Sequence, residues 1–272
     1  MSRRRHLATA TFATVAMLVG LAPAAYAAQC GNGPAGFPTW KREFAQEARA
    51  RGVGDRALSA LMQAHYSSAT IAADRGARSF KLSLNQFLVK RGASVIVSRG
   101  RVLKRTHAAL FASIEHRYGV PPGPLIAIWG METGFGRERG HQNVLSSIAT
   151  LAYDCRRSAF FTDQLYATLK LIDRGVISPN ATGSSHGEIG QTQFMPKTIL
   201  NYGTGNLNDA AGALSSTANF LRAHGWRPGA GYQPGEPNFA AIQAWNAAPV
   251  YERALAMMGR EIDGGGRGAA ER

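Results

Sequence analysis

Glu132 is the residue whose type and setting point most directly to chemistry. It lies in the segment 121–136, which reads PPGPLIAIWGMETGFG. Apolar side chains cover nearly every face of a helix here, so we expect this helix to lie in a core: Leu125, Ile126, Ile128 and Trp129. Gly134 and Gly136 can end the helix just after the acid. The segment therefore predicts a lone acid in the last turn of a buried helix.

Two effects oppose the ionisation of a carboxyl in that position. Burial disfavours the charged form, and so does the negative end of the helix dipole, so both raise the pKa of Glu132. A raised pKa is what a general acid needs near neutral pH. The alternative is an exposed glutamate just past a core helix, as most glutamates are. The segment alone leaves both interpretations open.

The first 27 residues predict a cleavable signal peptide. Arg3, Arg4 and Arg5 precede an apolar run over 8–21, and Ala-Tyr-Ala at 25–27 is a small-x-small cleavage site. The run is short for a membrane span. Gln29 before Cys30 matches a lipoprotein signal poorly. We expect an exported, periplasmic protein without a lipid anchor; an uncleaved anchor is the alternative.

Export changes the interpretation of the two cysteines, Cys30 and Cys155. An oxidising compartment and an even count permit one disulfide bond, and two unpaired thiols are the alternative. No CxxC motif or Cys/His spacing indicates a metal site, and we expect no cofactor.

Charge restricts the class of partner. The formal net charge is +14, and it falls by three without the arginines of the signal segment. An exported basic protein meets anionic cell-envelope polymers rather than nucleic acid, and no nucleic-acid-binding signature is present. Simple solubility is the alternative explanation of the charge.

The remaining pattern is helical, and no alternating strand pattern stands out. With 272 residues, 45% of them hydrophobic, the chain can form one large domain or a main domain with a smaller partner. We expect caps at Thr39, Asp55, Ser158 and Asp209, and further helices over 77–90, 106–118, 144–153, 193–202, 239–245 and 250–258. A polar Gly/Ser-rich loop spans 178–190, and the fold class is mainly α.

Five blocks between 118 and 251 resemble the membrane-bound lytic murein transglycosylase B family in order and spacing. They read YGVPPGPLIAIWGMETGFG, ATLAYDCRRSAFF, GSSHGEIGQTQFMP, ANFLRAHGW and AWNAAPVY. The resemblance is weaker in the N-terminal part, including SFKLSLNQF. It implies a lysozyme-like catalytic domain over 106–263 and a smaller helical region over 28–105 packed on it. From its composition, we expect residues 264–272 to form a flexible tail.

The resemblance also implies a reaction. These enzymes cut the β-1,4 bond between N-acetylmuramic acid and N-acetylglucosamine in peptidoglycan without water, leaving a 1,6-anhydromuramyl end. One acid protonates the glycosidic oxygen and then deprotonates the muramyl C6 hydroxyl, and Glu132 matches it. Ordinary glycosidases need two carboxyl groups, but here the substrate's own hydroxyl replaces the activated water. A single glutamate with a raised pKa would suffice.

Seven further residues match substrate-contacting positions of the family: Ser184, Gln193, Trp245, Asn246, Tyr251, Arg156 and Arg157. Ser184 is implied to contact an acetamido group, and Gln193 to line the sugar cleft. The arginines could meet carboxylates of muramyl peptides. Without the resemblance, ordinary roles would be expected: a turn serine, a glutamine on a helix surface and arginines on a solvated face.

Trp245 and Asn246 match a Tyr-Asn pair of the family, and Tyr251 matches a cleft tyrosine. The amide of Asn246 could bond to the acid or the sugar, and Trp245 could stack on a sugar face. Trp245 keeps the stacking surface of the tyrosine but changes its polar tip. The alternative role of Trp245 is a core residue. Phe220 stands where the family has a tyrosine hydroxyl, so one polar contact is lost.

Several family members bind calcium in an acidic loop, but the matching segment here is NYGTGNLNDAAG. Asp209 is its only acid, whereas calcium sites usually use two or more carboxylates. We therefore expect no metal.

Glu188 stands at a position that is usually small in the family. If it faced Glu132, the site would have two carboxylates and could use water as a muramidase does. We expect instead an exposed loop glutamate. The alternatives to a transglycosylase are thus a water-using muramidase and a non-catalytic peptidoglycan-binding protein.

The expected partner is a glycan strand of peptidoglycan, with wall-synthesis or secretion machinery as possible protein partners, and we expect a monomer.

Overall fold

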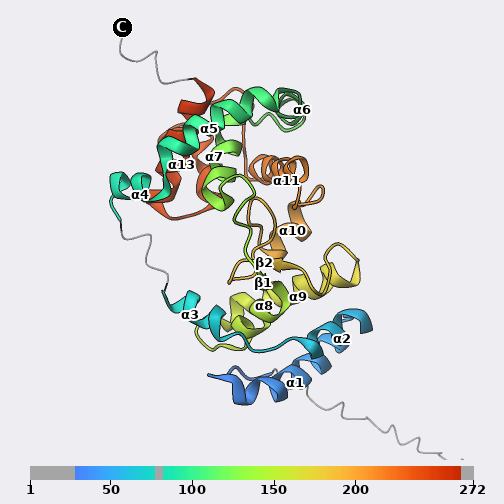
Figure 1. The fold of residues 1–272 in the computed structure, drawn as a ribbon. Helices are drawn as coiled ribbons and strands as arrows, with labels where there is room; N and C mark the ends of the chain where they lie inside the picture. Colours follow the sequence, from blue (N-terminus) through green and yellow to red (C-terminus); the bar gives the residue numbers. More distant parts are fainter. Residues whose placement is uncertain (1–27, 77–81, 265–272) are drawn as a thin grey trace, which may run out of the picture.

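The computed structural model describes residues 28–76 and 82–264. The predicted signal peptide and residues 265–272 of the predicted tail lie outside these ranges. The described chain is mainly helical, as predicted, with one small two-stranded sheet (Figure 1). The elements are η1 (Pro34–Gly36), α1 (Phe37–Ala50), α2 (Asp55–Gln63), α3 (Ser68–Gly76), α4 (Leu84–Arg91), α5 (Ala93–Thr106), α6 (Ala108–Tyr118), α7 (Pro122–Thr133), β1 (Gln142–Asn143), α8 (Val144–Tyr153), α9 (Ser158–Asp173), β2 (Thr182–Gly183), α10 (Pro196–Tyr202), α11 (Ala210–Ala223), α12 (Phe239–Trp245) and α13 (Pro249–Asp263).

Helix α7 lies in the core, and all its residues are buried except Glu132, which is half-buried. It packs against α13 and α5. Gly100 permits the close approach of α5, because a side chain there would meet Ile126 of α7. The helix ends at Gly134, which adopts the left-handed conformation (φ 55°) that glycine tolerates best. The predicted buried helix with Glu132 in its last turn is confirmed.

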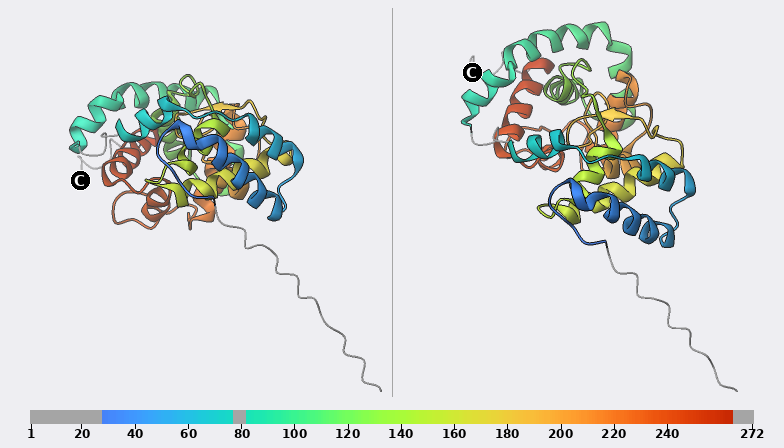
Figure 2. Two further views of the ribbon diagram at one scale, coloured as in Figure 1. Left: turned by 90° about the horizontal axis from the view of Figure 1, so that it is seen from below. Right: turned by 60° about the horizontal axis from the view of Figure 1, so that its bottom comes forward.

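The N-terminal helices contact the core at two separate places (Figures 1 and 2). Helices α1 to α3 pack against α8 and α9, whereas α4 and α5 pack against α13 and α7. The antiparallel pair β1 and β2 joins the segment after α7 to the loop that precedes α10. These strands have two residues each, which is too short for an alternating hydrophobic pattern, so they could not be predicted from the sequence.

Several predicted helices are confirmed, and several boundaries are wrong. Helices α8 and α12 have the predicted bounds, and Asp209 caps α11 by accepting a hydrogen bond from the Gly212 N–H at 2.7 Å. Helix α1 begins at Phe37 rather than after Thr39, and Asp55 and Ser158 are first-turn residues rather than caps. Helix α13 extends to Asp263, beyond the predicted end at 258.

Two helices, α3 and α5, were not predicted. Thr106 ends α5 instead of starting the next helix. Gly92, at φ 66°, ends α4 and begins α5, so a single left-handed residue joins two helices. The predicted helix over 77–90 corresponds to α4 from Leu84, and residues 77–81 lie outside the described ranges. Helix α10 begins at Pro196, because the preceding residues form a turn with Gln193 at φ 53°.

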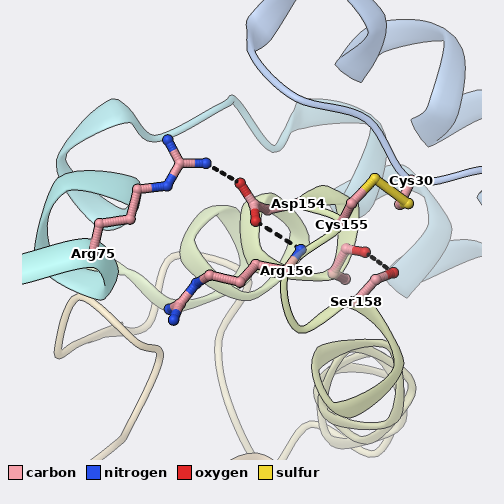
Figure 3. The surroundings of a disulfide bond; sticks show 7 residues. Cys30, Arg75, Asp154, Cys155, Arg156 and Ser158 are labelled. Atoms are coloured by element: carbon pink, nitrogen blue, oxygen red, sulfur yellow. Dashed lines mark hydrogen bonds and ion pairs between the residues drawn. A yellow bond between two sulfur atoms is a disulfide. The ribbon is translucent and has the colours of Figure 1, made fainter. Parts of the chain in front are cut away.

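Cys30 and Cys155 form a disulfide bond, which settles the alternative that the sequence left open (Figure 3). The Gly31 N–H donates to the Tyr153 carbonyl oxygen at 2.9 Å, so the first described residues run beside the end of α8. Buried Asp154 accepts hydrogen bonds from Arg75 at 2.8 Å and from the Arg156 N–H at 3.1 Å (Figure 3). Within the described ranges, none of the helices combines the length and apolar content that crossing a bilayer requires.

We predict that reduction of the disulfide lowers the free energy of unfolding by about 2–4 kcal/mol, because the bond closes a long loop in the unfolded chain. The two cysteines are 125 residues apart in the sequence. Urea unfolding with and without reductant measures the effect. A Cys30→Ala/Cys155→Ala protein should not respond to reductant. Equal unfolding midpoints for the parent protein in both conditions would contradict the prediction.

Candidate active site

The carboxyl group of Glu132 is held by two donors from the C-terminal helices. The Tyr251 hydroxyl, in α13, donates a short hydrogen bond to Glu132 Oε1. The Trp245 indole N–H, at the end of α12, donates to the same oxygen at 3.4 Å. Tyr251 is itself buried and packs edge-on against Phe87 of α4. The acid is therefore oriented by elements distant from α7 in the sequence.

The environment raises the pKa of Glu132 to about 7. Burial is the largest cause, and the hydrogen bond from Tyr251 opposes it. The negative charge of Glu188 raises the pKa further, while Trp245 and the positive charge of Arg91 lower it. The predicted direction of the shift is confirmed. A carboxyl with this pKa can both give and accept a proton near neutral pH.

Glu132 lies where two cavities adjoin. Their volumes are about 590 and 190 Å³, and both are lined by Glu132, Glu188, Met195 and Asn246. The larger cavity has mainly charged and aromatic walls, formed by Asp74, Arg91, Arg156, Arg157, Phe160, Phe161, His186 and Tyr251. The smaller one is lined further by Gln193, Phe194, Thr198, Phe220, Ala244 and Trp245. The two cavities thus meet at the acid and together form one cleft.

Arg156 and Arg157 line the larger cavity and share one buried partner, Asp74 of α3. The Asp74 side chain is 3% exposed, whereas the two arginine side chains are 46% and 42% exposed. His186 Nε2 lies 3.6 Å from the same carboxylate. Burial lowers the pKa of His186, which favours its neutral form. The arginines are therefore a fixed cationic wall, and not simply a solvated face.

Glu188 is half-buried and lines both cavities, so the prediction of an exposed loop glutamate is wrong. The Ser184 hydroxyl donates to Glu188 Oε2 at 2.7 Å and accepts from the N–H groups of His186 and Glu188. The residues that line the two cavities include Glu188 but not Ser184. Because a hydroxyl has one proton to donate, Ser184 is engaged by Glu188, and its predicted contact with an acetamido group stays a prediction.

Gln193, Trp245 and Asn246 all line the smaller cavity. Gln193 has a left-handed backbone conformation, which residues other than glycine rarely adopt. Its side-chain amide donates to the Gly190 carbonyl oxygen at 2.8 Å. It is a turn residue, so the alternative of a helix surface is wrong. Asn246 Oδ1 accepts from the Ala248 N–H at 3.0 Å, which anchors the turn between α12 and α13.

Trp245 packs edge-on against Phe194 and Phe220, with ring centroids 5.3 and 5.2 Å away. Phe220 is buried and stacks on His224 at 3.9 Å, so the ring that contacts Trp245 is itself held in place. Trp245 thus combines a packing role with a hydrogen bond to the acid.

The residues over 201–212 do not fit a calcium site. The Asp209 carboxylate is the only acid there, and it caps α11. One carboxylate already engaged by a backbone N–H is too small a donor set for calcium.

Asp74, Arg91 and His186 were not singled out from the sequence. Asp74 lies on the unpredicted helix α3, and its importance arises only from its contacts with residues about 80 positions away. Arg91 ends α4, where a basic residue is common for purely local reasons. No sequence signal distinguishes these residues from surface charges.

The chain matches the family described as "Transglycosylase SLT domain" over residues 36–236. Over 137 residues it is 36% identical to the membrane-bound lytic murein transglycosylase B of Escherichia coli (strain K12), a match that covers 44% of this chain and 38% of that protein. The matched stretch is thus less than half of that relative's length.

Two solved structures are similar in fold. SltB3 of Pseudomonas aeruginosa, in complex with NAG-anhNAM-pentapeptide, is 26% identical with a TM-score of 0.78, covering 85% of this chain and 80% of that chain. Slt35 of Escherichia coli, in complex with bulgecin A, is 23% identical with a TM-score of 0.72, covering 87% of this chain and 96% of that chain. The similarity to Slt35, at this low identity, shows a shared fold alone. Because the family match covers more than half of the chain, the chain belongs to the transglycosylase SLT domain family.

Proposed function

We propose that this protein is a lytic transglycosylase that cuts the glycan strands of peptidoglycan between N-acetylmuramic acid and N-acetylglucosamine. The observation that carries the proposal is the position of Glu132, an acid with a pKa of about 7 where two halves of a cleft meet. A polymer can cross such a site with sugars on both sides of the cleaved bond. The family and the muropeptide bound to SltB3 support this substrate class.

In the first step, protonated Glu132 gives its proton to the glycosidic oxygen. The bond from that oxygen to muramyl C1 breaks, and N-acetylglucosamine leaves with a free C4 hydroxyl. In the second step, the muramyl C6 oxygen bonds to C1 and its proton passes to the Glu132 carboxylate. The product carries a 1,6-anhydro ring, no water is consumed, and the acid regains its proton.

The surrounding residues suit these steps. Tyr251 and Trp245 donate to the carboxyl group of Glu132, which fixes its orientation and stabilises the carboxylate between the steps. Burial raises the pKa of Tyr251 well above its usual value, so Tyr251 keeps its proton and remains a donor. Arg156 and Arg157 present guanidinium groups to the carboxylates of a muramyl peptide.

A water-using muramidase is a second candidate, because Glu188 lines the same cavities as Glu132 and could serve as its second carboxylate. A peptidoglycan-binding protein without activity is the third. Mass spectrometry of the products from purified sacculi separates the three. Ends lighter by one water support the transglycosylase, reducing muramyl ends support the hydrolase, and co-sedimentation without products supports the binding protein.

We also propose that the protein is exported to the periplasm and works there. The disulfide bond supports this, because such bonds persist in oxidising compartments. The predicted signal peptide agrees with it.

We predict that Glu132→Gln lowers turnover by at least about 100-fold, because glutamine keeps the size and the acceptor oxygen but cannot supply a proton. Release of soluble muropeptides measures turnover, and co-sedimentation with sacculi should remain close to that of the parent protein. Glu43→Gln is the matched control, since Glu43 is exposed on α1. Turnover at the parental rate in Glu132→Gln would refute the assignment.

We predict that kcat/KM falls as pH rises through about 7. Glu132 must be protonated to begin the reaction, and its pKa in the free protein is about 7. Above that pH, the active fraction should drop about tenfold per pH unit. Initial rates on a soluble peptidoglycan tetrasaccharide between pH 5 and 9 test this. An alkaline limb that begins near pH 5, the range of an ordinary glutamate, would contradict the prediction.

We predict that Tyr251→Phe moves this alkaline limb to higher pH. The hydroxyl of Tyr251 stabilises the carboxylate form of Glu132, so its removal raises the pKa of the acid. The same variant should reduce kcat, because the carboxylate between the two steps loses a donor. A limb that stays in place or moves to lower pH would show that this hydrogen bond does not control the proton.

A further inference from the structure

Glu188 is a second carboxylate in the cleft, and the mechanism above does not use it. It comes from the loop between β2 and α10, whereas Glu132 comes from α7. The two side chains line both cavities together. Glu188 is therefore placed to act on Glu132 through the cleft without belonging to the same element.

The loop holds Glu188 firmly. Ser184 donates to its Oε2 at 2.7 Å, and the Glu188 N–H returns a hydrogen bond to the same hydroxyl at 3.2 Å. The two backbones are also joined, because the Ser184 N–H donates to the Glu188 carbonyl oxygen at 2.9 Å. The carboxylate is thus fixed by a closed turn of five residues, which the isolated bridge between Ile189 and Phe194 follows directly.

The groups that face Glu132 come from four elements. Tyr251 and Trp245 are neutral donors from α13 and α12, and both favour the carboxylate form of the acid. Arg91 of α4 lines the larger cavity and its positive charge favours the same form. Glu188 is the charged group that opposes them. The other charged or titratable side chains that line the larger cavity are Asp74, Arg156, Arg157 and His186, and the two arginines and His186 face Asp74. Glu188 is thus the negative charge that counters Arg91 at the acid.

We propose that Glu188 is a positioning residue of this site: held by Ser184, its negative charge offsets Arg91 and keeps the catalytic proton on Glu132 in the free enzyme. The inference rests on the proposed transglycosylase function. Glu188 touches neither the transferred proton nor the bond that breaks. It acts on the first step, through the fraction of Glu132 that carries the proton when substrate binds.

The test compares the pH dependence of the parent protein, Glu188→Gln and the control Glu43→Gln. Glutamine keeps the size of Glu188 and can still accept from Ser184, so the substitution removes only the charge. We expect the alkaline limb of kcat/KM to move down by roughly half to one pH unit in Glu188→Gln. At pH 8 this is a several-fold loss of rate, whereas at pH 5.5 the rate should stay near the parental value. Glu43→Gln should match the parent at every pH.

A second measurement needs no substrate. Trp245 donates to Glu132, so the pH titration of tryptophan fluorescence in the parent, minus that in Glu132→Gln, follows the charge of the acid. Its midpoint should fall by the same amount in Glu188→Gln, measured against a Glu132→Gln/Glu188→Gln blank. If Glu188→Gln does not fold, Glu188→Ala removes the same charge and should give the same shift.

The outcomes separate the two proposals. Reducing muramyl ends from the parent protein would overturn the transglycosylase function itself. Anhydro products from the parent, together with an unmoved or raised limb in Glu188→Gln, would overturn the role of Glu188 alone. Loss of rate at all pH values in a folded Glu188→Gln protein would also overturn it, because the carboxylate would then take part in the chemistry directly.

Discussion

A carboxyl group at the end of a helix buried in the core must be compensated by residues that come from elsewhere in the chain. Helix α7 offers no donor to Glu132, because the hydroxyl of its neighbour Thr133 donates to the Gln191 carbonyl oxygen instead. Donors therefore come from α12 and α13, a positive charge from α4 and a negative charge from the loop before α10. These elements must all be in place before the acid has its working pKa. The packing of α13 and α5 around α7 is thus also the scaffold of the chemistry.

Asp74, another carboxylate that lines the larger cavity, is buried and is surrounded by positive charges instead. Asp74 is bracketed by the guanidinium groups of Arg156 and Arg157, which compensate the charge of its carboxylate. This pairing binds α3 to the start of α9, and the disulfide bond ends in the residue directly before Arg156. Removal of either arginine would leave a poorly compensated buried charge, which costs several kcal/mol in typical cases. The N-terminal helices therefore help to build the cationic wall of the cleft.

The sequence predicted the parts that depend on local patterns. The apolar run of α7, the cap at Asp209 and the bounds of α8 follow from periodicity and capping, and the helical fold class follows from them. The parts that depend on tertiary contacts were missed or misjudged. Helix α5 buries a stripe interrupted by Gly100 and carries basic residues around it, which obscured its period. Glu188 reads as a loop residue because its neighbours are polar, and only the folded turn brings it into the cleft. The roles of Ser184, Gln193 and the arginine pair rest on the family resemblance, since spacing alone would have suggested ordinary surface roles.

Both donors to Glu132 reach the same atom, Oε1. A free carboxyl group has two interchangeable oxygens, but here the protein makes them different. Oε1 already accepts two hydrogen bonds, so the proton of the neutral acid belongs on Oε2. Oε1 then fixes the orientation of the carboxyl group, and Oε2 is the oxygen that carries the proton. In the proposed reaction, the proton would leave from and return to a single point in space, and the two steps would bring the glycosidic oxygen and the C6 hydroxyl to that point in turn. That reaction would require the sugar to move and the carboxyl group to stay in place.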